Sequence, residues 1–237
     1  MRAALVVALV LVSACQGAAP APSDSPIVAS PTATVEPAYC DVADVLTAAR
    51  GYGDFAKTAL DHTNALPPEY APPDLVPVTR AGFAALAGER VRAIAVPDLT
   101  ALREAAARDG VTLAVFSGYR SYAEQKATFD HWVQVGGYEG ALRTSARAGH
   151  SEHQLGTALD LGTGPKAPWE EPQFASGPAG RWLATHATEY GFVLSYPEGK
   201  ERVTCYAFEP WHFRWVGRDV AARVKASGLT LREFLAG

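Results

Sequence analysis

The chain has 237 residues, of which 48% are hydrophobic, and its formal net charge at pH 7 is -4. This length and composition fit one globular domain of about 200 residues with appendages, a size that buries a core without needing disulfides. The mild acidity and the absence of a basic run argue against a nucleic-acid partner, and ordinary solubility explains the net charge.

The N-terminal segment is predicted to be an export signal. Arg2 precedes an apolar run of about ten residues, 3–12, which is too short to span a bilayer and typical of a signal peptide. Residues 12–15 resemble the lipobox of bacterial lipoproteins; an ordinary secretory signal with a chance cysteine is the alternative. We expect residues 1–14 to be a signal peptide, Cys15 to carry lipid, and the protein to be exported and lipid-anchored in the bacterial cell envelope.

The segment that follows Cys15 is expected to be a tether. Residues 16–38 consist mainly of Pro, Ala, Ser and Thr, with few large apolar side chains. Such a composition buries too little surface to offset the entropy of ordering, so we expect residues 15–38 to be disordered and 39–237 to form the folded domain.

Two cysteines remain after Cys15, namely Cys40 and Cys205. In an exported protein two such thiols can pair, which would join the start of the domain to the segment around residue 205. Two separate buried thiols are the alternative, because a sequence does not reveal the distance between the cysteines.

The predicted elements mix helices and short strands without a repeating β-α-β rhythm. The first half of the domain is predicted to contain an irregular proline-rich segment at 65–78, a helix at 98–108, a buried strand at 111–117 and a helix from 121 to about 135. A short strand at 157–161 and a helix at 179–190 follow. Strands are then expected at 192–196, 203–208 and 212–216, with a hairpin turn at 198–200, before two terminal helices. Ser121 with Glu124, and Thr230 with Glu233, have the spacing of capping boxes. This order favours an α+β fold with a small, mainly antiparallel sheet flanked by helices.

Three side chains are candidate metal ligands. His153 and Asp160 flank Gly156, which lets the chain bend, and His212 lies far downstream. Two histidines and a carboxylate with an open fourth position are typical of a catalytic zinc site, whereas closed structural sites favour cysteines.

Two further residues suit the chemistry of such a site. Glu209, three residues before His212, is a candidate base that takes a proton from the attacking water and passes it to the leaving amine. Arg120 lies in the predicted turn between a strand and a helix. It offers a fixed positive charge for a developing oxyanion or a substrate carboxylate.

Each of these residues also has a structural interpretation. Asp160 could cap a backbone group, and "EPWHFRW" could be an edge strand with aromatic packing. Lone histidines are usually structural or solvent-facing, as we expect of His62, His131 and His186. We expect His150 either to contact the metal ligands from outside or to lie at the edge of the substrate-binding cleft. Spacing alone leaves a zinc hydrolase and this structural interpretation both open.

Residues 151–160 match the motif S-x-H-x-x-G-x-A-x-D of the zinc D-alanyl-D-alanine carboxypeptidases, and Glu209 with His212 matches their downstream E-x-x-H. The stretches "ALPPEYAPPDLV", "SGYRSYAEQ" and "GFVLSYPEGK" match in the same order. Over most of residues 60–217 the chain therefore resembles the VanY-like D,D-carboxypeptidases associated with vancomycin resistance, and more broadly the LAS peptidases of cell-wall metabolism.

The resemblance implies a fold of the hedgehog/D,D-peptidase type and one zinc ion per chain. The implied zinc ligands are His153, Asp160 and His212. Glu209 is implied as general base and acid, and Arg120 as the residue that binds and polarises the substrate. The implied pocket residues are Ser117, Tyr119, Gln125 and Ser151. Many relatives have glycine at the position of Cys205, so a side chain or a disulfide to Cys40 is expected to reshape the floor of the cleft.

The implied activity is removal of the terminal D-Ala from peptidoglycan stem peptides that end in D-Ala-D-Ala. Apart from the resemblance, we expect a monomer that is held at the membrane through its N-terminal lipid. An L,D-carboxypeptidase or a peptidoglycan endopeptidase with the same zinc site is the nearest alternative. A non-catalytic wall-binding lipoprotein with a structural metal is another. The sequence contains no G-x-S-x-G motif, which disfavours a serine hydrolase.

Overall fold

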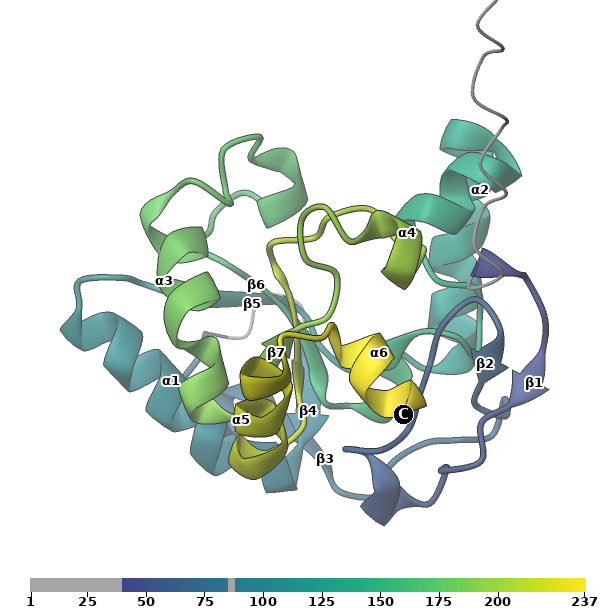
Figure 1. Ribbon diagram of the computed structural model, residues 1–237. Coiled ribbons are helices and arrows are strands. Elements are labelled where there is room, and N and C mark those ends of the chain that lie inside the picture. The colour runs from purple at the N-terminus through teal and green to yellow at the C-terminus, as the bar shows by residue number, and fades with distance from the viewer. Residues whose placement is uncertain (1–39, 85–87) are drawn as a thin grey trace, which may run out of the picture. The chain divides into compact units, whose positions relative to one another are not determined.

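The computed structural model describes residues 40–84 and 88–237 (Figure 1). The predicted signal peptide, the lipidation site Cys15 and the tether at 15–38 lie outside the described residues. Within the described ranges, no helix combines the length and the apolar character needed to cross a bilayer.

A four-stranded antiparallel sheet forms the centre of the domain. Its strands are β5 (Ala114–Ser117), β6 (Ala158–Gly162), β8 (His212–Trp215) and β7 (Phe192–Leu194), in this spatial order. Two short pairs accompany it: β1 (Val45–Leu46) with β2 (Asn64–Ala65), and β3 (Leu75–Pro77) with β4 (Arg90–Arg92). The prediction of an α+β fold around a small, mainly antiparallel sheet is confirmed.

The two faces of the central strands differ in chemistry. Leu159, Leu161 and Phe213 point to one face and belong to the main hydrophobic core. Their neighbours in the sequence, including Asp160 and His212, point to the other face because side chains alternate along a strand. Both β6 and β8 are buried along their whole length, so the second face is a polar interior and not a solvent-exposed surface.

Helices cover the hydrophobic face. The first is α1 (Val96–Arg108), which buries Leu99 and Leu102 against the core, as its predicted apolar face requires. It is joined by α3 (Pro178–His186), which continues into the 3-10 helix η7 (Ala187–Tyr190). Figure 1 shows α1 and α3 on the same side of the strands. The remaining 3-10 helices are η2 (Tyr52–Asp54), η3 (Val78–Ala81), η4 (Ala93–Ala95), η5 (Glu152–Leu155) and η6 (Pro168–Glu170).

Both predicted capping boxes form. Ser121 precedes α2 (Tyr122–Thr144), where the Ser121 N–H donates to Glu124 Oε2 at 2.7 Å and the Glu124 N–H donates back to Ser121 Oγ at 3.3 Å. Thr230 and Glu233 cap α6 (Leu231–Ala236) in the same way, after α5 (Arg218–Ser227). The predicted helix end near residue 135 is a kink: Gly137 has φ 74°, and helical structure resumes beyond it.

The predicted strand at 203–208 is wrong. The chain instead forms α4 (Glu201–Thr204), a single helical turn that ends at Cys205 with φ 68°. The β-branched Val203 and Thr204 favoured a strand, but both of their N–H groups donate to the Lys200 carbonyl, which closes a turn. The predicted turn at 198–200 exists, with Gly199 at φ 74°, but it leads into α4 and is not a hairpin.

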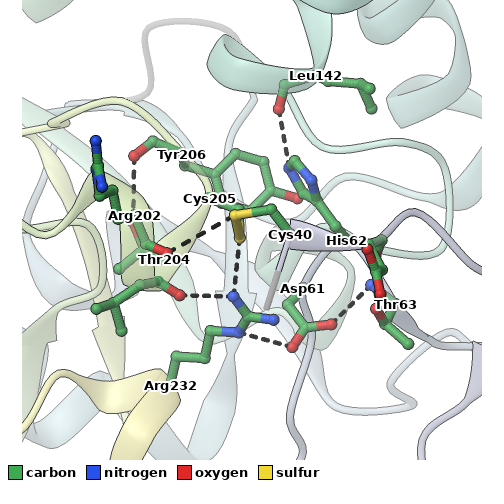
Figure 2. The surroundings of a disulfide bond; sticks show 12 residues. Cys40, Asp61, His62, Thr63, Leu142, Arg202, Thr204, Cys205, Tyr206 and Arg232 are labelled. Atoms are coloured by element: carbon green, nitrogen blue, oxygen red, sulfur yellow. Dashed lines mark hydrogen bonds and ion pairs between the residues drawn. A yellow bond between two sulfur atoms is a disulfide. The ribbon is translucent and has the colours of Figure 1, made fainter. Parts of the chain in front are cut away.

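A disulfide between Cys40 and Cys205 joins the start of the described domain to the end of α4 (Figure 2). The two Cα atoms are 5.4 Å apart, although 165 residues separate them in the sequence. Arg232, on α6, lies beside the bridge and forms an ion pair with Asp61 at 2.9 Å. The pairing that the sequence left open is therefore present, and it joins two segments that lie far apart in the sequence.

Candidate metal centre

The three predicted ligands converge on the polar face of the sheet. One potential ligand atom from each of His153, Asp160 and His212 lies within 4.8 Å of the others, and all three residues are buried. Asp160 and His212 are direct register partners on β6 and β8, which brings His212 Nδ1 to 3.2 Å from Asp160 Oδ1. Ser117 pairs with Asp160 from the other side, on β5. Cross-strand partners share a face of the sheet, so the pairing itself assembles this part of the site.

His153 comes from η5 and not from the sheet. Ser151 caps this short helix, accepting a hydrogen bond from the His153 N–H at 3.3 Å. Gly156 ends it with φ 70°, a conformation that favours glycine, and a Cβ there would lie 2.8 Å from a Leu75 methyl carbon. The serine and the glycine of the motif therefore begin and end the short helix that carries His153.

The ring of His153 is oriented by its own hydrogen bond. Its Nδ1 lies 2.7 Å from the Gly118 carbonyl oxygen, and so carries the proton. Its Nε2 is buried, lies 3.3 Å from Asp160 Oδ2 and makes no hydrogen bond to any described residue. A buried imidazole nitrogen that faces two other ligand atoms without a hydrogen bond is suited to bind a metal ion.

The electrostatics of the cluster favour a bound cation. Burial lowers the pKa of His153 to about 4, and Arg120 acts in the same direction, so this imidazole is neutral. Burial would raise the pKa of Asp160, but the two histidines outweigh it and hold the pKa of this carboxyl well below its usual range. Burial would lower the pKa of His212, but hydrogen bonds to carboxylates on both sides raise it to about 10. The carboxylates around His212 thus favour positive charge at this cluster, where a divalent cation can bind.

Glu209 lies beside this cluster without belonging to it. Its Oε2 is 3.9 Å from His212 Nδ1, and its backbone N–H donates to the Tyr196 carbonyl at 3.1 Å. Burial raises the pKa of Glu209 to about 7, although His212 opposes the increase. A carboxyl group with a pKa near neutrality, next to a metal centre, is suited to accept and release a proton.

Arg120 lies where the sequence placed it, in the turn between β5 and α2. Its backbone N–H donates to the His153 carbonyl at 3.3 Å, which ties it to the ligand loop. Its buried side-chain Nε makes no hydrogen bond to any described residue. The guanidinium group lines the same cavity as the cluster and is therefore available to an anionic group of a ligand.

The cluster lies at a cavity of about 400 Å³. Three of the predicted pocket residues, Ser117, Gln125 and Ser151, line it. Tyr119 is not among the described residues that line it. Its ring packs under the Arg90 guanidinium, 5.1 Å from the ring centre, and its backbone N–H donates to the Arg90 carbonyl. Aromatic side chains make up another part of the wall: Phe116, Trp132, Trp169, Tyr196 and Trp211.

The other histidines are not part of the cluster. His62 contacts the Leu142 carbonyl at 2.9 Å and is structural, as expected, while His131 and His186 lie at the surface. The expectation for His150 is wrong. It is buried against the N-terminal segment, where its ring nitrogens lie 2.7 Å from the Asp61 carbonyl and 2.9 Å from Asp44 Oδ1. It therefore fastens that segment and does not border the cleft.

Sequence reasoning missed a buried polar group behind His212, formed by Glu152, Ser195 and Arg214. Glu152 Oε2 lies 3.0 Å from His212 Nε2. A signal for part of this group was present: Arg214 is two residues from His212 in an otherwise apolar strand, so the two side chains share a face. Glu152 had no comparable signal, because an acidic residue next to a ligand is usually solvated.

The sheet, the converging His-Asp-His cluster and the adjacent glutamate define an α+β domain of the metallopeptidase type. The chain belongs to the VanY family of D-alanyl-D-alanine carboxypeptidases, whose sequence profile matches residues 88–218.

Known proteins agree with this assignment. The chain is 39% identical over 172 residues to a protein of Bacillus subtilis (strain 168) named as a carboxypeptidase, YodJ; the match covers 72% of this chain and 63% of that protein. The solved structure of the LD-carboxypeptidase LdcB matches with a TM-score of 0.65 and 36% identity, covering 75% of this chain and 84% of that one.

A structure of the vancomycin-resistance D,D-pentapeptidase VanY, from a VanB-type cassette in complex with Zn(II), matches with a TM-score of 0.64 and 30% identity. The match covers 76% of this chain and 99% of that one. VanYB has also been solved in complex with D-alanine-D-alanine. Among curated relatives, the chain spans 63%, 56% and 39% of the lengths of three proteins that it matches.

Proposed function

We propose that this protein is a zinc-dependent D,D-carboxypeptidase that removes the terminal D-Ala from peptidoglycan stem peptides ending in D-Ala-D-Ala. One observation carries the proposal: His153 Nε2, Asp160 and His212 Nδ1 converge beside Glu209 at a cavity of about 400 Å³. Family membership supports the substrate class, as do the VanY structures with Zn(II) and with D-alanine-D-alanine.

Each group of residues at the site has a separate role in the proposed reaction. His153, Asp160 and His212 would hold Zn²⁺, which when bound would supply Lewis-acid chemistry at the scissile carbonyl. Glu209 takes a proton from the attacking water and delivers it to the leaving amine of D-Ala. Arg120 faces the cavity with its unused donors and offsets negative charge on the substrate, at the carbonyl oxygen or at the terminal carboxylate.

The polar part of the cavity wall suits a short peptide. Gln125 is held by its Nε2, which donates to the Ala146 carbonyl at 2.6 Å, and its buried Oε1 makes no hydrogen bond to any described residue. Ser117 and Ser151 add hydroxyl groups to the same wall. These groups can pair with the amide and carboxylate groups of a stem peptide, whose burial would otherwise be costly.

Cleavage of tetrapeptide stems by the same site, an L,D-carboxypeptidase activity, is the second candidate. It is favoured by the likeness to LdcB, which has a higher identity to this chain than the VanY structures have. Incubation with pentapeptide and tetrapeptide stems, followed by mass spectrometry of the products, separates the two. Release of D-Ala from the pentapeptide supports the D,D activity, and release from the tetrapeptide alone overturns it. Cleavage within a stem or cross-bridge identifies an endopeptidase, and no turnover of any stem supports a non-catalytic wall-binding protein.

We further propose that the protein acts outside the cytoplasmic membrane, anchored through lipid on Cys15. The N-terminal sequence pattern supports this proposal, and so does the location of peptidoglycan, the proposed substrate. Replacing Cys15 with serine should move the protein from the membrane fraction to the soluble fraction. Unchanged membrane retention of the Cys15→Ser variant would contradict the lipid anchor.

A further inference from the structure

A buried polar group lies behind His212, on the opposite side of its ring from Asp160. Glu152 Oε2 is 3.0 Å from His212 Nε2, while Asp160 Oδ1 is 3.2 Å from Nδ1. The imidazole is therefore held between two carboxylates, one at each nitrogen. Only the Nδ1 side faces the other candidate ligands, so the two carboxylates have different surroundings.

Glu152 is held in place at both of its oxygens. Arg214 Nη1 donates to Oε1 at 2.8 Å, and the Ser195 hydroxyl donates to Oε2 at 2.6 Å. Glu152 is 5% exposed, Arg214 0% and Ser195 3%. Every hydrogen bond of this carboxylate is thus made inside the protein, and its position is set by residues from β8 and from the segment after β7.

Arg214 in turn is anchored to the N-terminal part of the domain. Its Nη2 donates to the Phe55 and Thr58 carbonyls at 2.5 and 2.7 Å. A buried ion pair is seldom more stable than apolar side chains of similar volume, because desolvating both charges is costly. A contribution to folding stability alone is therefore a weak explanation for a carboxylate directed at one particular ring nitrogen.

The orientation of a metal-binding histidine depends on the hydrogen bond made by its second nitrogen. An imidazole that donates from Nε2 has its lone pair at Nδ1. In this protein Nδ1 of His212 is the nitrogen that faces His153 and Asp160. A carboxylate acceptor at Nε2 selects that tautomer, fixes the ring about its Cβ–Cγ bond and makes Nδ1 a better donor to a metal.

We propose that Glu152 is a positioning residue for the metal centre: it accepts the Nε2–H of His212 and so presents Nδ1 to the metal, while Arg214 and Ser195 hold its carboxylate in place. The inference rests on the proposed zinc site. Glu152 lies behind His212 and is not among the described residues that line the cavity, so we expect no contact between Glu152 and the substrate.

Zinc affinity is the primary test, because it can be measured without any hydrolysis. The dissociation constant of purified protein for Zn²⁺ is determined by competition with a chromophoric chelator, for the parent and for Glu152→Gln, Glu152→Ala and Ser195→Ala. We expect about 10- to 100-fold weaker binding for the two Glu152 variants, and a smaller loss for Ser195→Ala. Asp61→Asn is the matched control, since Asp61 is a buried, ion-paired carboxylate outside the metal cluster.

A spectroscopic measurement separates positioning from a general loss of structure. In the zinc-loaded parent, long-range proton–nitrogen NMR correlations should show His212 protonated at Nε2. In the Glu152 variants the Nε2 proton should exchange faster with water, while the far-ultraviolet circular dichroism is unchanged. If Glu152→Ala does not fold, Glu152→Gln and Ser195→Ala decide the question by the same two measurements.

The proposal is overturned if the folded variants bind zinc within about twofold of the parent, or if His212 is protonated at Nδ1 in the zinc-loaded parent. A failure of the proposed enzymatic function looks different: the parent would bind zinc tightly but release no D-Ala from any stem peptide. The role of Glu152 would survive that result.

Discussion

Asp160 and His212 are paired in register on adjacent antiparallel strands, and 3.2 Å separates Asp160 Oδ1 from His212 Nδ1. Two of the three candidate ligands are therefore positioned by the backbone hydrogen bonds of the sheet. The third, His153, comes from a glycine-ended turn. A site built on a rigid sheet and one tight turn needs little rearrangement to bind a metal.

Loss of one ligand should therefore empty the site without unfolding the sheet. We expect Asp160→Asn to lower the zinc content well below one ion per chain and to abolish hydrolysis, because an amide is a poorer and neutral ligand. Elemental analysis of the dialysed protein measures the zinc content. Asp130→Asn is the control, since Asp130 is an exposed residue paired with Lys126 on α2. Full zinc occupancy of the Asp160→Asn variant would exclude Asp160 as a ligand.

Glu209→Gln should separate metal binding from catalysis. The amide keeps the shape of the side chain but cannot accept a proton from water. We expect the rate of D-Ala release to fall by about 10²- to 10⁴-fold, with the zinc content unchanged. Glu198→Gln, at an exposed position in the preceding turn, serves as control. A Glu209→Gln variant with the parent's rate and zinc content would remove Glu209 from the mechanism.

The disulfide should contribute to stability mainly by restricting the unfolded chain, because it closes a loop across 165 residues. We expect Cys40→Ala combined with Cys205→Ala to lower the free energy of unfolding by about 2–4 kcal/mol. Urea denaturation of the parent, with and without a reductant, provides the comparison. Equal stability of the oxidised and reduced parent would contradict this expectation.

The backbone at Cys205 allows a sharper comparison. Its φ of 68° is unfavourable for any residue with a Cβ and comfortable for glycine. Cys40→Ala with Cys205→Gly should therefore be more stable than Cys40→Ala with Cys205→Ala, by about 1 kcal/mol. The same urea midpoints measure the difference. A lower midpoint for the glycine variant would show that the left-handed conformation depends on the disulfide.

The ion pair between the buried Asp61 and the partly buried Arg232 should make the free energy of unfolding depend on pH. Burial would raise the pKa of Asp61, but backbone N–H groups and Arg232 outweigh it, so the folded-state pKa lies below 3.8. A lowered carboxyl pKa stabilises the fold above the unfolded-state value, and this stabilisation is lost as the pH falls through the folded-state value.

Asp61→Asn removes that contribution. We expect the variant to be less stable than the parent by about 1.5–3 kcal/mol at pH 7, and the difference to shrink as the pH is lowered from about 5 toward 2. Thermal denaturation of both proteins across this range measures the effect. A difference that does not change with pH would show that the ionised carboxylate is not its source.

Local patterns in the chain predicted much of this structure. The capping box at Ser121 and Glu124 sets the start of α2, and the apolar spacing of Leu99 and Leu102 sets the buried face of α1. Both signals depend on interactions within one or two helical turns. The prediction failed at α4, where β-branched residues suggested a strand but backbone bonding to Lys200 closed a turn.

By itself the sequence determined which residues are candidate metal ligands. His153, Asp160 and His212 lie in short motifs, and the resemblance of these motifs to those of zinc carboxypeptidases implied their role as ligands. Only the tertiary structure decided what surrounds them. Glu152 meets Arg214, and Cys40 meets Cys205, across long separations in sequence. Such contacts depend on how distant segments pack against one another, and no local pattern specifies that packing.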